Sequence, residues 1–143
     1  MKRVLSRILV IVALLGGTAI AFEAPAYATE SQCGSTSVCL WGEDDYSGCF
    51  RGMSTTKVDD YATIRWASPC TARIDNGANS VKNEGTSCSV RLYDGVNQSG
   101  SFILFNRELD GANFRDPYLA NGGGTGSSSG QNWQDRISSH LFC

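Results

Sequence analysis

The sequence predicts an all-β domain that contains a duplicated motif and three disulfide bonds. Short apolar or alternating runs recur between turns rich in Gly, Asn, Asp and Ser, and no segment after residue 28 keeps a helical period. A 13-residue pattern recurs, without a gap, at a constant offset of 52 residues. All six cysteines lie after residue 32. Periodicity, duplication and cysteine content therefore indicate one small, cross-linked β domain.

Three runs, residues 38–41, 89–93 and 101–105, have the length and residue types of β-strands. One helical turn is expected within residues 56–64, because Ser and Thr residues just before it can cap a helix. Residues 121–130 consist of Gly, Ser, Thr and Asn and are expected to form a flexible surface loop, since few of their side chains can be buried. The alternative for this tract is a binding loop.

The repeat aligns residues 38–50 with residues 90–102 without a gap. Each copy begins as a strand that ends in an aromatic residue, passes through a polar turn and reaches a glycine, Gly48 or Gly100. Both glycines can adopt the positive φ that a tight bend requires, so each copy is predicted to be a bent hairpin.

Segments 75–81 and 134–139 close the two units, which span about residues 33–84 and 85–143. Each unit is too small to bury its apolar face alone. We therefore expect the units to stack around one core.

The first 28 residues are predicted to be a secretory signal peptide. Three basic residues precede an apolar run over residues 8–21, and the small residues Ala26 and Ala28 flank Tyr27 as in a signal peptidase site. A membrane anchor is the alternative, but a spanning helix needs roughly 20 apolar residues, more than this run supplies. Cleavage after Ala28 would leave residues 29–143 as a single secreted, extracellular domain. We expect it to be a monomer without a membrane anchor.

The formal charge of −2 for the chain becomes −4 for residues 29–143, because the leader holds three basic residues and one acid. The basic residues are scattered singly, which argues against a nucleic-acid partner. Six cysteines in an exported chain predict three disulfides. A metal site is the alternative, but the chain has one histidine, His140, and no C-x-x-C spacing. The 15 pairings of six cysteines stay open on spacing alone.

The repeat resembles the Greek-key signature of the βγ-crystallins: an aromatic, four residues, a second aromatic, one residue and a glycine, with a serine in the last strand of the unit. The first copy meets this signature at Trp41, Tyr46, Gly48 and Ser80. The second copy meets it at Tyr93, Gly100 and Ser139, whereas Gln98 stands at the second aromatic position. The resemblance implies two Greek-key motifs that form a βγ-crystallin-like β-sandwich, stapled by disulfides.

The order of the leader, a Cys-x5-Cys-Leu-Trp segment and a Ser-Cys-Ser-Val-Arg-Leu-Tyr strand resembles actinobacterial secreted proteins of peptidase inhibitor family I36, from about Cys33 to Cys143. The resemblance implies a non-enzymatic inhibitor of an extracellular peptidase that requires no cofactor. It implies a metalloprotease target of the thermolysin type, which accepts apolar side chains beside the cleaved bond. The disulfide pairings that we expect first are Cys33–Cys39, Cys49–Cys70 and Cys88–Cys143.

The candidate inhibitory loop is residues 64–71. Ile64 or Trp66 would enter the peptidase cleft in an extended conformation, and Pro69 and a disulfide at Cys70 would stiffen the loop. Such ordering before binding reduces the entropy lost on association. The alternative is that Ile64 and Trp66 pack in the core.

The alternative function is calcium binding, in a domain with a structural, adhesion or killer-toxin-like role. Microbial βγ-crystallins carry paired Asn/Asp-Asn/Asp-x-x-Ser/Thr-Ser loops, whose oxygen atoms suit this hard cation. Residues 75–80 depart from that pattern at Asn79, and residues 134–139 depart from it at Gln134. The ligands implied are Asp75, Asn76, Asn79, Ser80, Asp135, Ser138 and Ser139. The other interpretation is that the serines hold the hairpins and the polar residues form turns.

An enzyme is not expected. His140 is the only imidazole, and it stands at a strand end, where a structural role is commoner than base catalysis. Glu43, Asp44 and Asp45 are consecutive in a turn, which favours solvated charges over a pair of catalytic acids.

Overall fold

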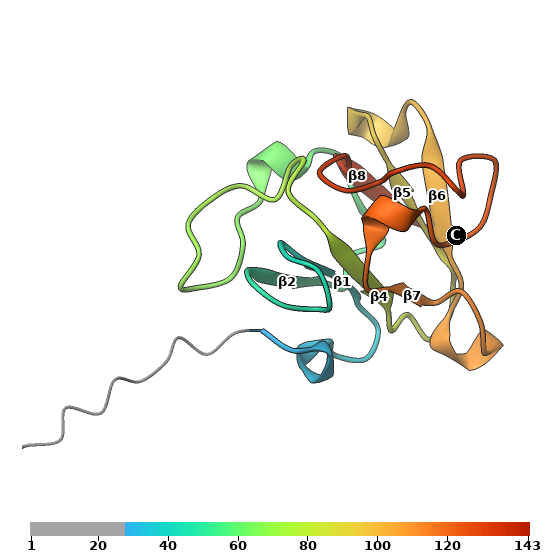
Figure 1. Cartoon of the computed structure of the whole chain (residues 1–143), viewed down its shortest axis with the longest axis horizontal. Coiled ribbons are helices and arrows are strands. Elements are labelled where there is room, and N and C mark those ends of the chain that lie inside the picture. Colours follow the sequence, from blue (N-terminus) through green and yellow to red (C-terminus); the bar gives the residue numbers. More distant parts are fainter. Residues whose placement is uncertain (1–27) are drawn as a thin grey trace, which may run out of the picture.

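The computed structural model describes residues 28–143, so the predicted signal peptide lies outside the described residues except for Ala28. The described chain forms two four-stranded antiparallel sheets (Figure 1). The strands are β1 (Val38–Trp41), β2 (Phe50–Met53), β3 (Lys57–Val58), β4 (Ser80–Asn83), β5 (Val90–Tyr93), β6 (Phe102–Phe105), β7 (Arg115–Asp116) and β8 (Ser139–Phe142). The all-β prediction is confirmed, and β1, β5 and β6 fall on the three predicted runs. Within residues 28–143 no helix has the length and apolar character needed to cross a membrane.

Each sheet takes one strand from the other half of the chain. The first sheet has the order β2-β1-β4-β7, and the second has the order β3-β8-β5-β6. Strand β3 of the first repeat unit pairs with β8, whereas β7 of the second unit pairs with β4. The expected pair of Greek keys therefore forms one sandwich, and neither unit holds a complete sheet by itself.

Five short 3-10 turns lie before and between the strands of the described chain. They are η1 (Glu30–Gln32), η2 (Tyr61–Thr63), η3 (Val96–Gln98), η4 (Glu108–Asp110) and η5 (Leu119–Asn121). The helical turn expected within residues 56–64 is shorter than predicted, because Lys57 and Val58 pair with β8 and form a strand. The cap of η2 is Asp60, whose carboxylate accepts a hydrogen bond from the Ala62 amide at 2.8 Å.

The two Greek-key corners have the same backbone geometry although Gln98 replaces an aromatic residue. Tyr46 and Gln98 both have φ near 56°. The Tyr46 amide donates to Ser80 Oγ at 3.1 Å, and the Gln98 amide donates to Ser139 Oγ at 3.2 Å. Each serine hydroxyl then donates to the carbonyl three residues before Tyr46 or Gln98, at 2.9 and 2.6 Å. The serines therefore hold both corners.

The corners differ in their side-chain contacts. The ring of Tyr46 packs edge-to-face on Trp41, with 5.1 Å between the ring centroids. The side-chain amide of Gln98 instead donates to the carbonyl of Val58 at 3.0 Å. In the second corner a hydrogen bond to the exchanged strand β3 thus replaces an aromatic contact.

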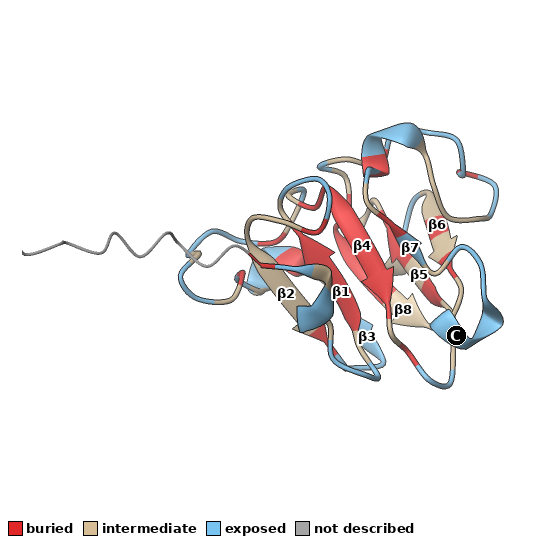
Figure 2. Ribbon diagram, turned by 60° about the horizontal axis from the view of Figure 1, so that its bottom comes forward, coloured by how far each residue is buried: buried red, intermediate tan, exposed pale blue. Residues whose placement is uncertain are grey.

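The main core lies between the two sheets. Its largest fully buried apolar side chains come from strands and loops of both units: Tyr61, Trp133, Phe105, Leu40, Ile74, Leu92, Ile103, Leu119 and Ile137. A second, smaller cluster joins Ala28, Cys39, Trp41 and Tyr46. Strand β1 is buried along its whole length, because one face meets the main core and the other meets this cluster (Figure 2).

The three disulfides join Cys33 to Cys39, Cys49 to Cys70 and Cys88 to Cys143. These are the pairings expected first, and no cysteine of the described chain is free. Their sequence separations are 6, 21 and 55 residues, so the last two restrict the unfolded chain most.

The Gly/Ser tract at residues 121–130 is attached to the second sheet. Thr125 and Leu104 exchange two backbone hydrogen bonds, of 2.8 and 3.0 Å. The Trp133 indole donates to the carbonyl of Ser128 at 2.9 Å. This tethering differs from the flexible excursion expected from composition, because the tract covers part of the open edge of β6, where unpaired backbone groups need partners.

We predict that acid destabilises the fold through His140, which is fully buried and has hydrogen-bond contacts to the Tyr61 hydroxyl and the Thr55 carbonyl, at 2.8 and 3.1 Å. Burial lowers the pKa of His140 below its usual value of 6.5. The unfolded chain therefore binds a proton first, and the free energy of unfolding falls as the pH drops from about 6.5 towards the lowered pKa, by at most about 1.4 kcal/mol per pH unit.

Urea unfolding at pH 7.5 and 5.0 measures this loss. In His140→Gln, which cannot titrate in this range, the difference between the two pH values should shrink. An equal difference in both proteins would contradict the assignment.

Candidate functional site

Residues 64–74 form a two-armed loop that projects from the sandwich at the left of Figure 1. The Ile74 amide donates to the Ile64 carbonyl at 3.1 Å, and the Trp66 amide donates to the Ala72 carbonyl at 3.2 Å. These bonds hold the arms together. Residues 67–71, which we call the loop tip, remain beyond the last pair.

The side chains expected to enter a peptidase are not available on this loop. Trp66 is only 6% exposed and belongs to the main core, and Ile64 is half-buried against the same core. The alternative stated for them, packing in the core, is what the structure shows. The arms turn these apolar side chains towards the core, so Ile64 and Trp66 help to fix the loop.

The loop tip is fixed at several points. A disulfide joins Cys70 to Cys49, and the Ala67 amide donates to the Phe50 carbonyl at 2.8 Å. The Arg65 guanidinium donates to the carbonyl of Thr71. Pro69, predicted as a stiffening residue, is exposed at the tip together with Ser68 and Thr71. The tip therefore presents small polar and ring side chains on an ordered backbone.

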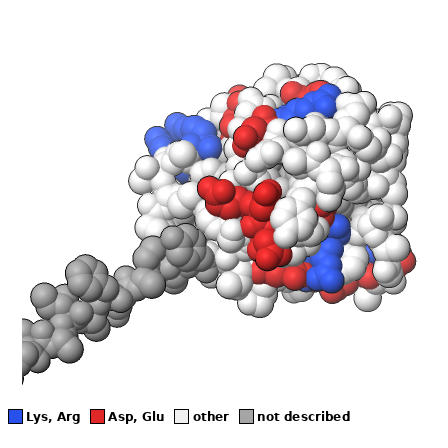
Figure 3. All heavy atoms as spheres, in the orientation of Figure 1, with Lys and Arg blue, Asp and Glu red and all other residues white. Residues whose placement is uncertain are grey.

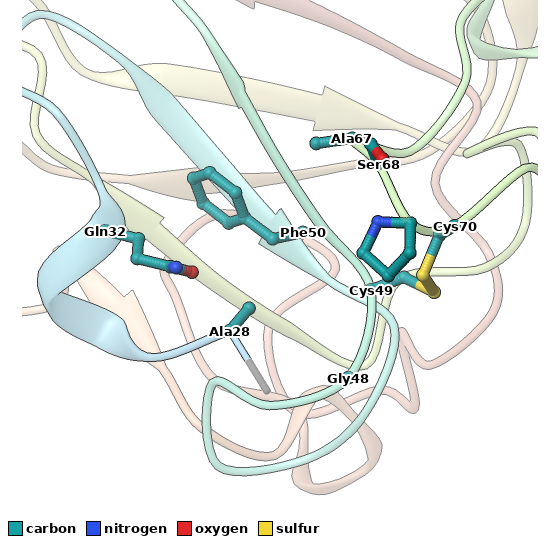
Figure 4. A pocket seen from close by; sticks show the side chains of 9 residues that line it. Ala28, Gln32, Gly48, Cys49, Phe50, Ala67, Ser68 and Cys70 are labelled. Atoms are coloured by element: carbon teal, nitrogen blue, oxygen red, sulfur yellow. A yellow bond between two sulfur atoms is a disulfide. The ribbon is translucent and has the colours of Figure 1, made fainter. Parts of the chain in front are cut away.

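A hollow of about 310 Å³ adjoins the loop tip. Its lining comes from the chain near η1, from the start of β2 and from the tip: Ala28, Gln32, Gly48, Cys49, Phe50, Ala67, Ser68, Pro69 and Cys70. Figure 4 shows Gln32 and the Cys49–Cys70 disulfide on opposite sides of it, with the Phe50 ring between them. The Phe50 ring, the sulfur atoms and Gln32 give this hollow a mixed apolar and polar surface that can receive a partner's side chain.

The two polar loops expected to bind calcium lie against each other. The Asn76 amide donates to the Ile137 carbonyl at 3.1 Å, and the Asp135 amide donates to the Ala78 carbonyl at 3.0 Å. Asn76 and Asp135 both have φ of 52°. The Ser138 hydroxyl donates to Asn76 Oδ1 at 3.3 Å. Two segments far apart in the sequence thus form one pair of crossed loops.

The candidate calcium ligands divide into two groups. Ser80 and Ser139 use their hydroxyls to hold the Greek-key corners, as the second interpretation of these loops expected. Asp75 Oδ1 and Asn79 Oδ1 are buried and accept no hydrogen bond within the described chain. Asn79 is 8% exposed. Oxygen atoms of this kind are costly to bury without a partner, so these two residues are the ones that a bound cation or water would satisfy.

The groups considered for catalysis lie in different environments, one buried and the others exposed. His140 is buried among Tyr61, Thr55 and Phe142. Glu43, Asp44 and Asp45 are exposed in the turn after β1. Acidic side chains lie in the middle of the face in Figure 3, and basic side chains on that face stand in separate positions. Residues 28–143 contain no cluster of three or more His, Cys, Asp or Glu side chains that could hold a metal.

The most exposed large apolar residue of the described chain was not singled out by the sequence. Leu109 is 77% exposed in η4, between Glu108 and Asp110. The signal available in the sequence was a single apolar residue inside a polar turn, flanked by two acids. Such a pattern by itself is ordinary for a surface.

Comparison with solved structures defines the class of the fold. A βγ-crystallin domain from a study of the evolution of the eye-lens fold matches with a TM-score of 0.55 and 18% identity, over 77% of this chain and 87% of that one. The βγ-crystallin of Ciona intestinalis matches with a TM-score of 0.52 and 17% identity, over 75% and 99% of the two chains. The chain therefore has the βγ-crystallin fold, as the repeat predicted.

The family follows from the sequence itself. The model of peptidase inhibitor family I36 matches residues 26–105, more than half of the 143 residues, so the chain belongs to this family. It is thus a non-enzymatic inhibitor whose expected partner is a peptidase. A comparison with curated proteins gives no match. The family match ends with β6, so the Leu109 turn and the second polar loop lie outside it.

We predict that the Cys49–Cys70 disulfide keeps the loop tip ordered. In the double variant Cys49→Ser, Cys70→Ser, hydrogen exchange of the Ala67 and Cys70 amides should become at least about tenfold faster, because their hydrogen bonds then open locally. The whole protein should lose about 2–4 kcal/mol of stability.

The matched control is Cys33→Ser, Cys39→Ser, which removes the disulfide that joins the segment before β1 to β1 and should leave exchange at the tip unchanged. Equal acceleration at the tip in both variants would show that the tip depends on global stability alone.

Proposed function

We propose that the protein is a secreted inhibitor of an extracellular peptidase and that the loop tip, residues 67–71, enters the active-site cleft. Membership of family I36 supports the activity. The binding site is assigned from a projecting loop whose arms are hydrogen-bonded to each other. The tip of this loop is joined to the sandwich by the Cys49–Cys70 disulfide. Three disulfides and the predicted leader support secretion.

The mechanism depends on ordering before binding. A flexible loop loses conformational entropy when a cleft closes around it, at about 0.5–1.5 kcal/mol for each immobilised side chain. The loop tip has lost most of that freedom already, through the Ala67–Phe50 hydrogen bond and the disulfide. A rigid tip also resists cleavage, because its peptide bonds cannot move into the geometry of attack.

The proposed target is a metallopeptidase of the thermolysin type, as the resemblance to the family implies. Since Trp66 is buried and Ile64 is half-buried, the tip would enter the cleft with Ser68, Pro69 and Thr71. The hollow beside the disulfide would receive a side chain from the rim of the cleft. Cleavage after Ala28 would remove one wall of this hollow and widen it.

The test is a titration of residues 29–143 into thermolysin-like and subtilisin-like peptidases, with Ser68→Trp as the tip variant. Because Ser68 is exposed, the new indole should leave the fold intact and obstruct entry into the cleft. We expect the inhibition constant to rise at least about 100-fold, as for loss of a contact at the centre of an interface.

Ser127→Trp is the matched control, since Ser127 is exposed in the Gly/Ser tract away from the tip. Absence of inhibition by the unaltered protein at micromolar concentration would end the inhibitor proposal. Equal inhibition by Ser68→Trp would end only the assignment of the tip.

A second function, calcium binding at the crossed polar loops, is favoured by the unpartnered buried oxygens of Asp75 and Asn79. Asp75, Asn76, Asn79, Asp135 and Ser138 would hold the ion, together with backbone carbonyls. Carboxylate, amide and hydroxyl oxygens fit a hard cation. The ion would supply positive charge that joins the two loops, and with them the two halves of the chain.

Calorimetry on chelator-treated protein tests this site. At a calcium concentration 100 times the dissociation constant, binding should add about 2.7 kcal/mol to the stability and raise the melting temperature by several degrees. Asp135→Ala should remove both signals, whereas Asp44→Ala, in a separate exposed turn, should keep them. No heat and no thermal shift at millimolar calcium would rule the site out.

A further inference from the structure

A second ordered loop, residues 106–113, projects from the other side of the sandwich. Leu109 at its centre is the most exposed of the three exposed large apolar residues of the described chain, at 77% against 44% for both Val96 and Tyr118. An exposed leucine alone is unremarkable. The way in which its loop is held distinguishes this one.

The loop is closed by hydrogen bonds at its base and across its turn. The Asn106 amide donates to the Asn113 carbonyl at 2.9 Å, and the Asn106 side chain donates to the Ala112 carbonyl at 3.1 Å. The Arg107 guanidinium donates two hydrogen bonds to the carboxylate of Asp110. These two residues flank Leu109 in the sequence. The backbone that carries Leu109 is therefore held by hydrogen bonds although most of its side chain is exposed.

The base of this loop is also tied to the core. The buried Asn83 side chain donates to the carbonyls of Phe105 and Asn106, at 3.1 and 2.9 Å. Beside the loop lies a hollow of about 470 Å³. It is lined by loop residues, by the Cys88–Cys143 disulfide and by neighbouring side chains, which include Arg91 and Leu104.

The same three features surround the loop tip at residues 67–71. Each site has an exposed loop closed by hydrogen bonds and an adjoining hollow whose lining includes a disulfide. The two loops lie on opposite sides of the sandwich in Figure 1, where the first projects at the left and η4 lies at the lower right. One globular peptidase that covers the first loop would leave the second free.

We propose that residues 106–113 form a second peptidase-binding element, in which Leu109 enters an apolar subsite of a second peptidase molecule. This inference rests on the proposed inhibitory function. Among the side chains that the two loops expose, Leu109 is the one that suits a subsite for large apolar residues, because Trp66 is buried and Ile64 is half-buried against the core. Full burial of a leucine contributes about 10- to 100-fold in affinity.

The experiment measures the stoichiometry of the complex by light scattering, with the peptidase that residues 29–143 inhibit best. We expect two peptidase molecules on each inhibitor. Leu109→Asp should reduce this to one and keep inhibition through the loop tip. Ser68→Trp should also reduce it to one, and the double variant should bind none.

Val96→Asp is the matched control, because it places the same charge on another exposed apolar residue and should keep two peptidases bound. Melting temperatures within about 2 °C of the unaltered protein would show that each variant is folded. A 1:1 complex that Leu109→Asp leaves unchanged would overturn the second element and leave the proposed function standing. Failure of the unaltered protein to inhibit any peptidase would overturn both.

Discussion

The exchange of strands between the two repeat units is the constraint on which the rest of the structure depends. Val58 in β3 lies opposite His140 in β8, and Val81 in β4 lies opposite Asp116 in β7, so each half of the chain completes the sheet of the other. The main core forms only when both halves are present. The crossed loops around Asn76 and Asp135 follow from the same exchange, because it brings the ends of the two units together.

On this rigid sandwich the surfaces available to a partner are loops. These loops are ordered by disulfides and side-chain hydrogen bonds rather than by pairing between strands. The loop tip depends on a disulfide to Cys49, whereas the Leu109 turn depends on the Arg107–Asp110 pair and on Asn83 beneath it. A small domain cannot bury enough apolar surface to order such projecting loops, so disulfides and hydrogen bonds order them instead. A fold shared with lens proteins can therefore carry a different function, since a fold does not fix the activity of the sites placed on it.

The two Greek-key corners show what a local sequence pattern can predict. The glycine and serine positions of the repeat predicted both corners, and they formed even where Gln98 replaced the aromatic, because the serine hydroxyl bonds backbone groups and does not need the ring. The candidate inhibitory loop shows where pattern stops. Its segment does project, but Trp66 turns into the core, and no periodicity over so few residues distinguishes an inward from an outward side chain.

The sequence by itself determined the all-β class, the duplication, three disulfides and the family. Each of these is indicated by the types of residues present and by their spacing along the chain. Only the tertiary structure decided which side chains are exposed. The exposure of Leu109, the burial of Ile64 and Trp66, and the tethering of the Gly/Ser tract to Leu104 all depend on elements distant in the chain. Such contacts are selected by the packing of the whole sandwich, which a local stretch of sequence does not encode.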